Sequence, residues 1–313
     1  IGLYLLHGRA TGVYSCYYRL LLGTALSPGA GMLLMLGFFA AFAVKRPAFP
    51  LHAWLPDAHP EAPTAGSVVL AGLLLKTGGY GLIRFVLPLF PEASRSFGPV
   101  AVWIGVAGIL YGGFMAFSQT DMKRLVAYTS VSHLGFVLLG IFAFNVQAMN
   151  GAVIQMLSHG LSTGALFILV GSLQDRLHTR ELAKMGGLWT AAPRFGAFGL
   201  VLTMALLGLP GFGNFIGEFL VLLGAYHASV AASVAAAIGL VFAMVYSLRM
   251  FQLAFHGERS DQREVRDLGP IEIAALSLMI LALFWLGLFP QASMDAASRA
   301  LGAILGLVQG AAA

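Results

Sequence analysis

Charged side chains are scarce in this sequence. Asp, Glu, Lys and Arg together make up 10% of the 313 residues, whereas a soluble domain carries about 25%. Cysteine is almost absent, with Cys16 as the only one in the sequence. One cysteine cannot form an intramolecular disulfide, and it matches no metal-binding motif. Walker motifs, haem attachment motifs and cysteine clusters do not occur. The composition therefore excludes a disordered chain, a disulfide scaffold and a nucleic-acid binder.

Apolar residues dominate instead. They make up 58% of the chain, and its mean hydropathy is +0.84. Four long segments contain no Asp, Glu, Lys or Arg, namely 20–44, 96–120, 125–174 and 273–294. A membrane-spanning helix needs roughly 20 apolar residues. The sequence therefore predicts an all-α polytopic membrane protein with eight spans, at about 28–45, 64–87, 98–118, 124–144, 148–173, 194–226, 229–255 and 271–290.

Basic residues alternate between the two ends of these spans. One set of ends carries most of the Lys and Arg residues, at 45–46, 123–124, 176–194 and 249–266. The opposite ends offer only Arg84, Arg95 and Arg299. By the positive-inside rule the first set is cytoplasmic, so the C-terminus is predicted on the outer side. Topology therefore accounts for the formal net charge of +5 without an acidic partner.

The chain is predicted to form one membrane domain over residues 1–313, because no linker or second domain interrupts it. It starts with Ile1, and the basic segment that opens a signal peptide is absent. We therefore expect the sequence to be an N-terminally truncated fragment of a longer protein, cut within an earlier span.

Two segments have the pattern of interrupted helices, which are 43–56 and 206–222. The residues that break them are Pro47, Pro50 and Pro56 in the first, and Gly208, Pro210, Gly211 and Gly213 in the second. Proline removes a helical donor, so the freed backbone groups need neighbours or water. Each break alone is compatible with a packing kink. Two breaks in corresponding places favour a transport site.

Five ionisable side chains lie in or beside the predicted spans. Lys76 and His159 are near the middle of the second and fifth spans, and His133 is about a third of the way along the fourth. Glu218 follows the second break, and Lys45 sits at the first. Ionisable groups at membrane depth usually face a bundle interior and mark proton or ion paths. These five residues are therefore candidates for an ion or proton path.

Structural alternatives remain open for each residue. Lys45, beside Arg46, is also typical of a flank that reaches the cytoplasmic interface. A lone histidine inside a helix is often a hydrogen-bonded structural residue. Lys76 and Glu218 reach no interface, so they form either a static ion pair or a site that changes partners.

Other sites are less well supported. His52, Asp57, His59 and Glu61 lie close together, but their spacing matches no zinc or calcium signature. GFGNFIG, at residues 211–217, lacks the preceding strand of a dinucleotide-binding turn. We therefore expect this chain to move charge without binding a metal or redox cofactor.

Four segments together resemble one family. They are FAVKRPAFPLHAWLPDAHPEAPTAGSVVLAGLLLKTGGYGLIRF, SQTDMKRLVAYTSVSHLGF, GAVIQMLSHGLSTGALFILVG and LPGFGNFIGEF. In this order they resemble the antiporter-like subunits of respiratory complex I, NADH:quinone oxidoreductase. Within that family, SVSHLGF, SHGLSTGALF and HTREL favour the subunit M branch, the counterpart of mitochondrial chain 4.

The resemblance implies an architecture. Members of the family have fourteen spans with two inverted five-helix repeats, and this chain would hold spans seven to fourteen in a bacterial plasma membrane. The end of the first repeat would be about 1–90, the second repeat about 96–256, and the last span and C-terminal tail about 268–313.

The resemblance also assigns roles. Lys45 matches the central pumping lysine of the first half, and Lys76 matches the lysine that connects the two half-channels. His133 and His159 match polar residues of the hydrated axis, and Glu218 matches the terminal proton site. The family's glutamate partner of Lys45 would lie before Ile1.

A subunit of this kind would work with other membrane subunits, including sister antiporter-like subunits, in the lipid bilayer. FMN, iron–sulfur clusters and quinone would be bound by partner subunits. Two alternatives share its motifs, a subunit of a multi-subunit cation/proton antiporter and one of a membrane-bound hydrogenase-type complex. A scaffold that no longer pumps is a third, although such a protein could replace Lys76 with leucine.

Overall fold

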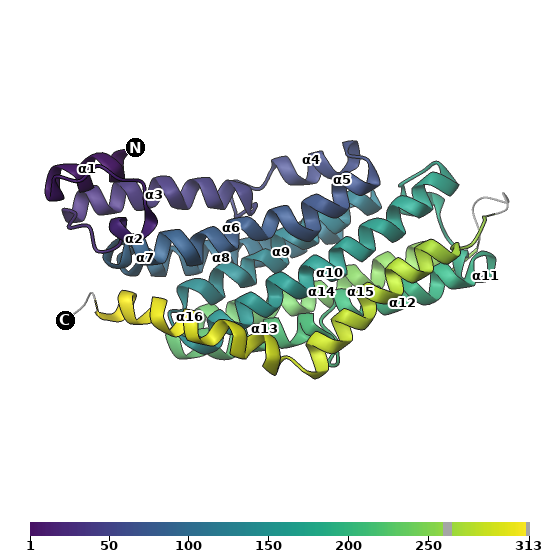
Figure 1. Cartoon of the computed structure of the whole chain (residues 1–313). Helices are drawn as coiled ribbons and strands as arrows, with labels where there is room; N and C mark the ends of the chain where they lie inside the picture. Colours follow the sequence, from purple (N-terminus) through teal and green to yellow (C-terminus); the bar gives the residue numbers. More distant parts are fainter. Residues whose placement is uncertain (259–264, 311–313) are drawn as a thin grey trace.

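Helices account for almost all regular structure in the computed structural model, which describes residues 1–258 and 265–310 (Figure 1). The α-helices are α1 Gly2–Thr11, α2 Tyr18–Leu21, α3 Pro28–Lys45, α4 Trp54–Glu61, α5 Thr64–Val69, α6 Leu75–Gly81, α7 Leu87–Leu89, α8 Pro91–Ser118, α9 Met122–Phe142, α10 Val146–Leu177, α11 Leu188–Ala191, α12 Pro193–Leu206, α13 Gly213–Ala228, α14 Val230–Phe255, α15 Pro270–Leu288 and α16 Gln291–Gly310. Two π-helical segments, η1 Leu70–Leu74 and η2 Leu82–Val86, and one 3-10 turn, η3 Leu182–Lys184, complete the set. The predicted all-α class is confirmed.

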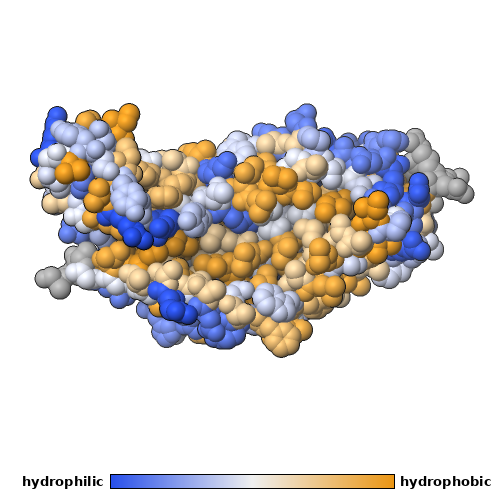
Figure 2. Space-filling view, in the orientation of Figure 1, coloured by the Kyte–Doolittle hydropathy of each residue, from blue (hydrophilic) through white to orange (hydrophobic). Residues whose placement is uncertain are grey.

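Seven helical segments within the described ranges are long and apolar enough to cross a membrane. One of them, Thr64–Leu89, runs through α5, η1, α6, η2 and α7 without a break. The remaining predicted span, 194–226, is divided into α12 and α13, each shorter than a full crossing. The chain is therefore a multi-pass membrane protein, and hydrophobic residues cover the middle of the face in Figure 2.

The first predicted interruption is present between α3 and α4. α3 ends at Lys45, and α4 continues in nearly the same direction from Trp54 (Figure 1). The indole Nε1 of Trp54 donates to the carbonyl of Val44 at 3.0 Å, which satisfies a group that the break leaves free. Pro47 is buried in the break, but Pro56 lies in the first turn of α4. Its assignment as a breaking residue is wrong, because a first turn tolerates proline.

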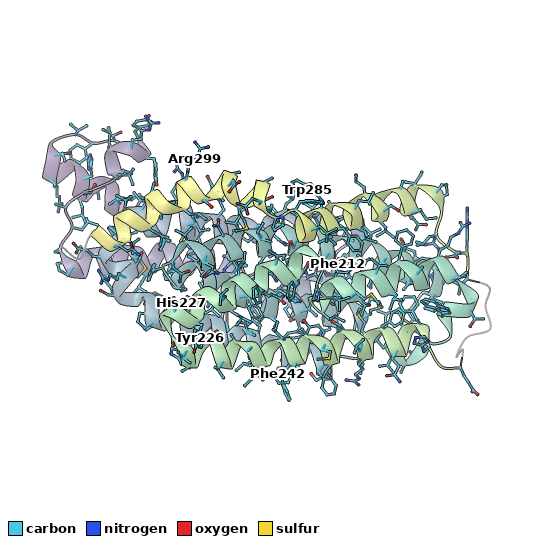
Figure 3. All side chains as sticks on the ribbon, turned by 90° about the horizontal axis from the view of Figure 1, so that it is seen from below. Phe212, Tyr226, His227, Phe242, Trp285 and Arg299 are labelled. Carbon is cyan, nitrogen blue, oxygen red and sulfur yellow. The ribbon has the colours of Figure 1, made fainter. Side chains whose placement is uncertain are left out.

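The second predicted interruption separates α12 from α13. Gly208 and Gly211 have φ angles of +75° and +108°, which favour glycine because it has no Cβ. Gly213 begins α13, and a Cβ there would stand 2.2 Å from the hydroxyl of Ser158. Phe212, labelled in Figure 3, lies in the break. Its ring packs 4.4 Å from that of Phe284 on α15.

Helix α9 lies at the centre of the bundle, and the whole of its apolar segment is buried. α8, α10, α13 and α4 pack around it. Glycines allow close approach, since a Cβ on Gly135 would stand 2.7 Å from the carbonyl of Gly105 on α8. Side chains of α9 therefore have little access to lipid, and its polar residues need partners on neighbouring helices.

The basic residues predicted to be cytoplasmic gather mostly at one end of the bundle. Ion pairs hold them there: Arg124 with Asp57 at 3.2 Å, Arg180 with Asp121 at 3.0 Å and Arg176 with Glu272 at 2.8 Å. Arg46 and Lys45 are exceptions, because the chain continues past them through α4. Arg46 reaches the carbonyl of Leu134, in the middle of α9. Residues 45–46 therefore lie beside the break and near the middle of α9, away from the other basic residues.

Helices α10 and α13 touch through glycines, which gives a stability prediction. A Cβ on Gly151 would stand 2.6 Å from the backbone nitrogen of Val221 and 2.9 Å from the carbonyl of Gly217. Gly151→Ala should therefore force the helices apart and cost about 1–3 kcal/mol. The midpoint of thermal aggregation in detergent, measured on the full-length subunit, should fall. Gly306→Ala is the matched control, because nothing lies within 4 Å of that position. An equal effect of both changes would contradict the packing argument.

Candidate functional site

Lys76 of α6 contacts His159 of the neighbouring helix α10. Its Nζ lies 2.8 Å from Nδ1 of His159 on α10 and also donates to the carbonyl of Ala71. Close helix packing makes the contact possible, since a Cβ on Gly160 would stand 2.7 Å from the carbonyl of Gly72. Because an ammonium group only donates, Nδ1 of His159 accepts and its proton resides on Nε2 when Lys76 is charged.

His133 and Glu218 form a second buried pair. Nδ1 of His133 lies 2.7 Å from Oε1 of Glu218, and both side chains are almost inaccessible. Gln155 donates to the same carboxylate oxygen at 2.9 Å, and the hydroxyl of Tyr246 lies 3.1 Å from Nε2 of His133. Four helices therefore contribute to this pair: α9, α10, α13 and α14.

The interruption before α13 gives the carboxyl group its space. A Cβ at Gly208 would stand 2.8 Å from Oε2 of Glu218. Any other residue there would therefore crowd the carboxylate as well as adopt an unfavourable φ of +75°. The predicted break and the predicted glutamate thus belong to one local arrangement.

The two pairs join into one polar row. The ring centroids of His133 and His159 are 5.7 Å apart. We use the name polar row for Lys76, His159, His133, Glu218, Gln155 and Tyr246. Several polar atoms beside it are buried without a hydrogen-bond partner among the residues described, including Ser158 Oγ, Thr163 Oγ1, His159 Nε2 and Gln155 Oε1. Such groups are usually satisfied by ordered water, so the row has places for it.

The structure brings four of the five predicted residues together and leaves Lys45 apart. Lys45 is exposed, and its side chain makes no hydrogen bond or ion pair within the part of the chain that is described. His133 lies midway along α9, so its predicted position nearer a helix end is wrong. Lys76 and Glu218 do not form a direct ion pair among the described residues, because the two histidines stand between them.

Three further residues were missed by sequence reasoning. Gln155 and Tyr246 complete the polar row. In the sequence they are a single amide and a single phenol inside apolar helices, and nothing in that pattern indicated a functional site. Arg46 is 1% exposed and donates to the carbonyl of Leu134 at 2.7 Å. Its Nε has no partner among the described residues, and Leu134 follows His133 in α9, so the guanidinium reaches the residue next to the row. A second basic residue beside Lys45 was the available signal, and it was attributed to the membrane interface.

This arrangement suits proton exchange. Four side chains of the polar row can bind and release a proton, in the order Lys76, His159, His133 and Glu218. Each contacts the next through a hydrogen bond or, between the histidines, through a short ring separation. Two charges at 5.7 Å interact by roughly 3 kcal/mol at an effective dielectric constant near 20. That is about a hundredfold in a proton-transfer equilibrium. Within residues 1–258 and 265–310, no three His, Cys, Asp or Glu side chains gather as a metal site requires.

Known proteins share this sequence and fold. The family model described as NADH:quinone oxidoreductase/Mrp antiporter, TM matches residues 3–244. NADH-quinone oxidoreductase subunit M of Pseudomonas aeruginosa is 52% identical over 99% of this chain and 62% of its own length. The subunit M of Escherichia coli is also 52% identical, over 97% of this chain and 60% of its own. The chain thus spans about three fifths of these curated relatives.

Solved structures agree with the sequence comparison. A chain of respiratory complex I from Thermus thermophilus has a TM-score of 0.91 and 35% identity, with 98% of this chain and 65% of that chain covered. A chain of the Mrp complex from Dietzia sp. has a TM-score of 0.86 at 21% identity, over 98% of this chain and 66% of that one, which shows the common fold alone. The predicted resemblance to subunit M is confirmed, and the chain belongs to the NADH:quinone oxidoreductase/Mrp antiporter family of membrane subunits.

Proposed function

We propose that this chain is the proton-translocating part of an antiporter-like subunit of bacterial NADH:quinone oxidoreductase. The observation that carries the proposal is the polar row, which links Lys76 to Glu218 through two histidines inside an apolar bundle. The name of the relatives at 52% identity supports the choice of enzyme.

Charge repulsion drives the proposed transfer along the row. A proton that passes from Lys76 to Nδ1 of His159 makes that ring an imidazolium, 5.7 Å from the ring of His133. The new cation favours loss of the proton that His133 shares with Glu218, and the carboxylate is the nearest acceptor at 2.7 Å. Protonated Glu218 then releases its proton at the break, His159 passes its extra proton on to His133, and Lys76 binds another proton, so every group returns to its starting form.

The setting of the subunit is part of the proposal. It lies in the bacterial plasma membrane with its C-terminus outside, as the distribution of basic residues predicts. Its partners are other membrane subunits of the complex, including sister antiporter-like subunits. Electron transfer, with FMN, iron–sulfur clusters and quinone, takes place in those partners. Residues 1–90 end the first inverted repeat, 96–256 form the second, and 268–313 form the last span and tail.

A multi-subunit cation/proton antiporter is the competing assignment, because the family includes both. Copurification of the full-length subunit from native membranes separates the two. We expect flavin and iron–sulfur proteins to copurify with it. Recovery of small hydrophobic subunits alone would contradict the proposal and favour the antiporter.

Lys76→Ala should abolish most proton pumping while the complex still assembles. The change removes the ammonium group that begins the polar row. Because the Lys76 side chain is only partly buried, its truncation should leave the packing of the bundle intact. Lys76→Arg should also fail, because arginine stays protonated and cannot release its proton. The measurement is the proton gradient per NADH oxidised in inverted vesicles. A normal gradient with Lys76→Ala would contradict the assignment.

Glu218→Gln should lower proton translocation by roughly tenfold or more, since glutamine keeps the shape but binds no proton. Glu218→Asp should retain part of the activity, because it keeps the carboxyl group with a shorter reach. Proton uptake per NADH is compared in reconstituted complexes at equal subunit content. Equal uptake for Gln and Glu at this position would show that its protonation is not used.

His133→Gln and His159→Gln should each lower proton pumping, because either change removes a ring that joins the two pairs. His227→Gln is the matched control: this histidine is exposed near the end of α13 (Figure 3) and lies outside the row. The same vesicle assay applies, with complex content measured beside it. Full activity of the His133→Gln enzyme would remove that residue from the pathway.

A further inference from the structure

His59 of α4 is a buried histidine that the polar row does not use. Its side chain is 0% exposed. Its ring stacks on that of Phe167 on α10, with centroids 4.2 Å apart and an interplanar angle of 22°. Neither Nδ1 nor Nε2 has a hydrogen-bond partner among the described residues. Since buried polar groups are almost always hydrogen-bonded, both nitrogens call for ordered water.

The contact with Phe167 places His59 on the same face of α10 as the polar row. Phe167, Thr163 and His159 follow one another at intervals of four residues, so they lie above one another on that helix. Thr163 Oγ1 and His159 Nε2 are also buried without a partner in the described chain. About 12 Å of helix separates Phe167 from His159. Buried groups that require water thus mark a line from His59 to the Lys76–His159 pair.

A polar cavity lies beside His59 at the end of the bundle predicted to be cytoplasmic. Its volume is about 530 Å³, and Pro60, the residue after His59, lines it. The charged residues around it are Asp57, Glu61, Asp121, Glu181, Arg124 and Arg180. Arg180 donates to the carbonyl of Pro60 at 2.5 Å, which fixes the backbone next to His59. The cavity thus brings charged groups to the residues of α4 that stand next to His59 in the chain.

We propose that His59 relays protons from this polar cavity to the Lys76–His159 pair. The inference rests on the proposed function, because it names the uptake route of the same row. One ring nitrogen binds a proton from water on the cavity side, and the other releases its own proton to water beside Thr163. One proton crosses per cycle. The ring regains its starting form when the proton exchanges between its nitrogens or the ring turns on the face of Phe167.

Charged groups of several neighbouring elements lie near this route, whereas α5, whose Ser67 donates to the carbonyl of His59 at 3.2 Å, has none. Asp57 and Glu61 belong to α4 itself, Lys123 on α9 donates to the carbonyl of Ala62 at 3.4 Å, and Arg180 follows α10. Lys76 and His159 lie at its inner end. The cations disfavour a permanently charged His59, and the carboxylates on the cavity side favour arrival of protons. Both effects suit a group that is protonated only in passing.

The test uses His59→Phe and His59→Gln in the full-length subunit of the assembled complex. Phenylalanine keeps the stack on Phe167 but removes both nitrogens, whereas glutamine keeps hydrogen bonding without proton relay. We expect both to slow NADH-driven proton translocation about tenfold. The solvent deuterium isotope effect on proton translocation should rise in both variants. The loss of translocation should also be greater when the pH on the cavity side is high, because protons are scarce there. A purely packing role would move neither of these readouts.

His52→Phe is the matched control. His52 is also buried and stacks on a ring, that of Phe49 with centroids 5.7 Å apart. Within the described chain its other ring neighbours are Tyr111 on α8 and Tyr128 on α9, so its ring contacts lie outside α10. It should leave pumping unchanged. Normal pumping by both His59 variants would overturn the inference, as would an equal loss with His52→Phe. Failure of both His59 variants to assemble, while His52→Phe assembles, would show a structural role instead.

Glu218→Gln in the same assay separates this inference from the proposed function. If Glu218→Gln stops pumping and the His59 variants pump normally, the row stands and the uptake route is wrong. If Glu218→Gln pumps normally, the proposed function itself fails, whatever the His59 variants do.

Discussion

The buried pair of His133 and Glu218 is the interaction on which the rest of the bundle depends. A carboxylate removed from water costs several kcal/mol unless other groups satisfy it. Here His133 of α9 and Gln155 of α10 contact the carboxylate of Glu218 directly. Tyr246 of α14 contacts the imidazole of His133. Those helices must therefore converge on α13, in keeping with the burial of the apolar segment of α9. The same convergence joins the pair to His159 and Lys76.

Interrupted helices reconcile this polar interior with an apolar bilayer. The glycines between α12 and α13 let the chain turn beside Glu218, where Gly208 leaves no side chain against its carboxylate. The break between α3 and α4 has a different result. It turns Arg46 inward to the carbonyl of Leu134 and allows α4 to place His59 against α10. Irregular backbone at membrane depth is tolerated where protein or water surrounds it, and here it positions the ionisable groups.

The sequence predicted the class of fold, both interruptions and four members of the polar row. These features have local causes: long uncharged runs, proline and glycine clusters, and single ionisable residues in apolar helices. The pairing was not predictable, because which side chains meet depends on helix rotation and packing. Successive helix residues point about 100° apart, so Lys45 is exposed while Arg46 is buried. Gln155 and Tyr246 were missed because glutamine and tyrosine commonly have structural roles in helices. Only their proximity to Glu218 and His133 in the folded chain makes them part of the polar row.

Infrared difference spectroscopy of the assembled complex is the most direct test of the central claim, that Glu218 gains and loses a proton during turnover. A buried carboxylic acid absorbs in a region that ionised carboxylates leave empty. The account predicts a carboxylic acid band that appears and disappears as NADH drives the enzyme, and that is absent from the Glu218→Gln enzyme. A spectrum without such a change, or one that the substitution leaves intact, would contradict proton transfer through the polar row.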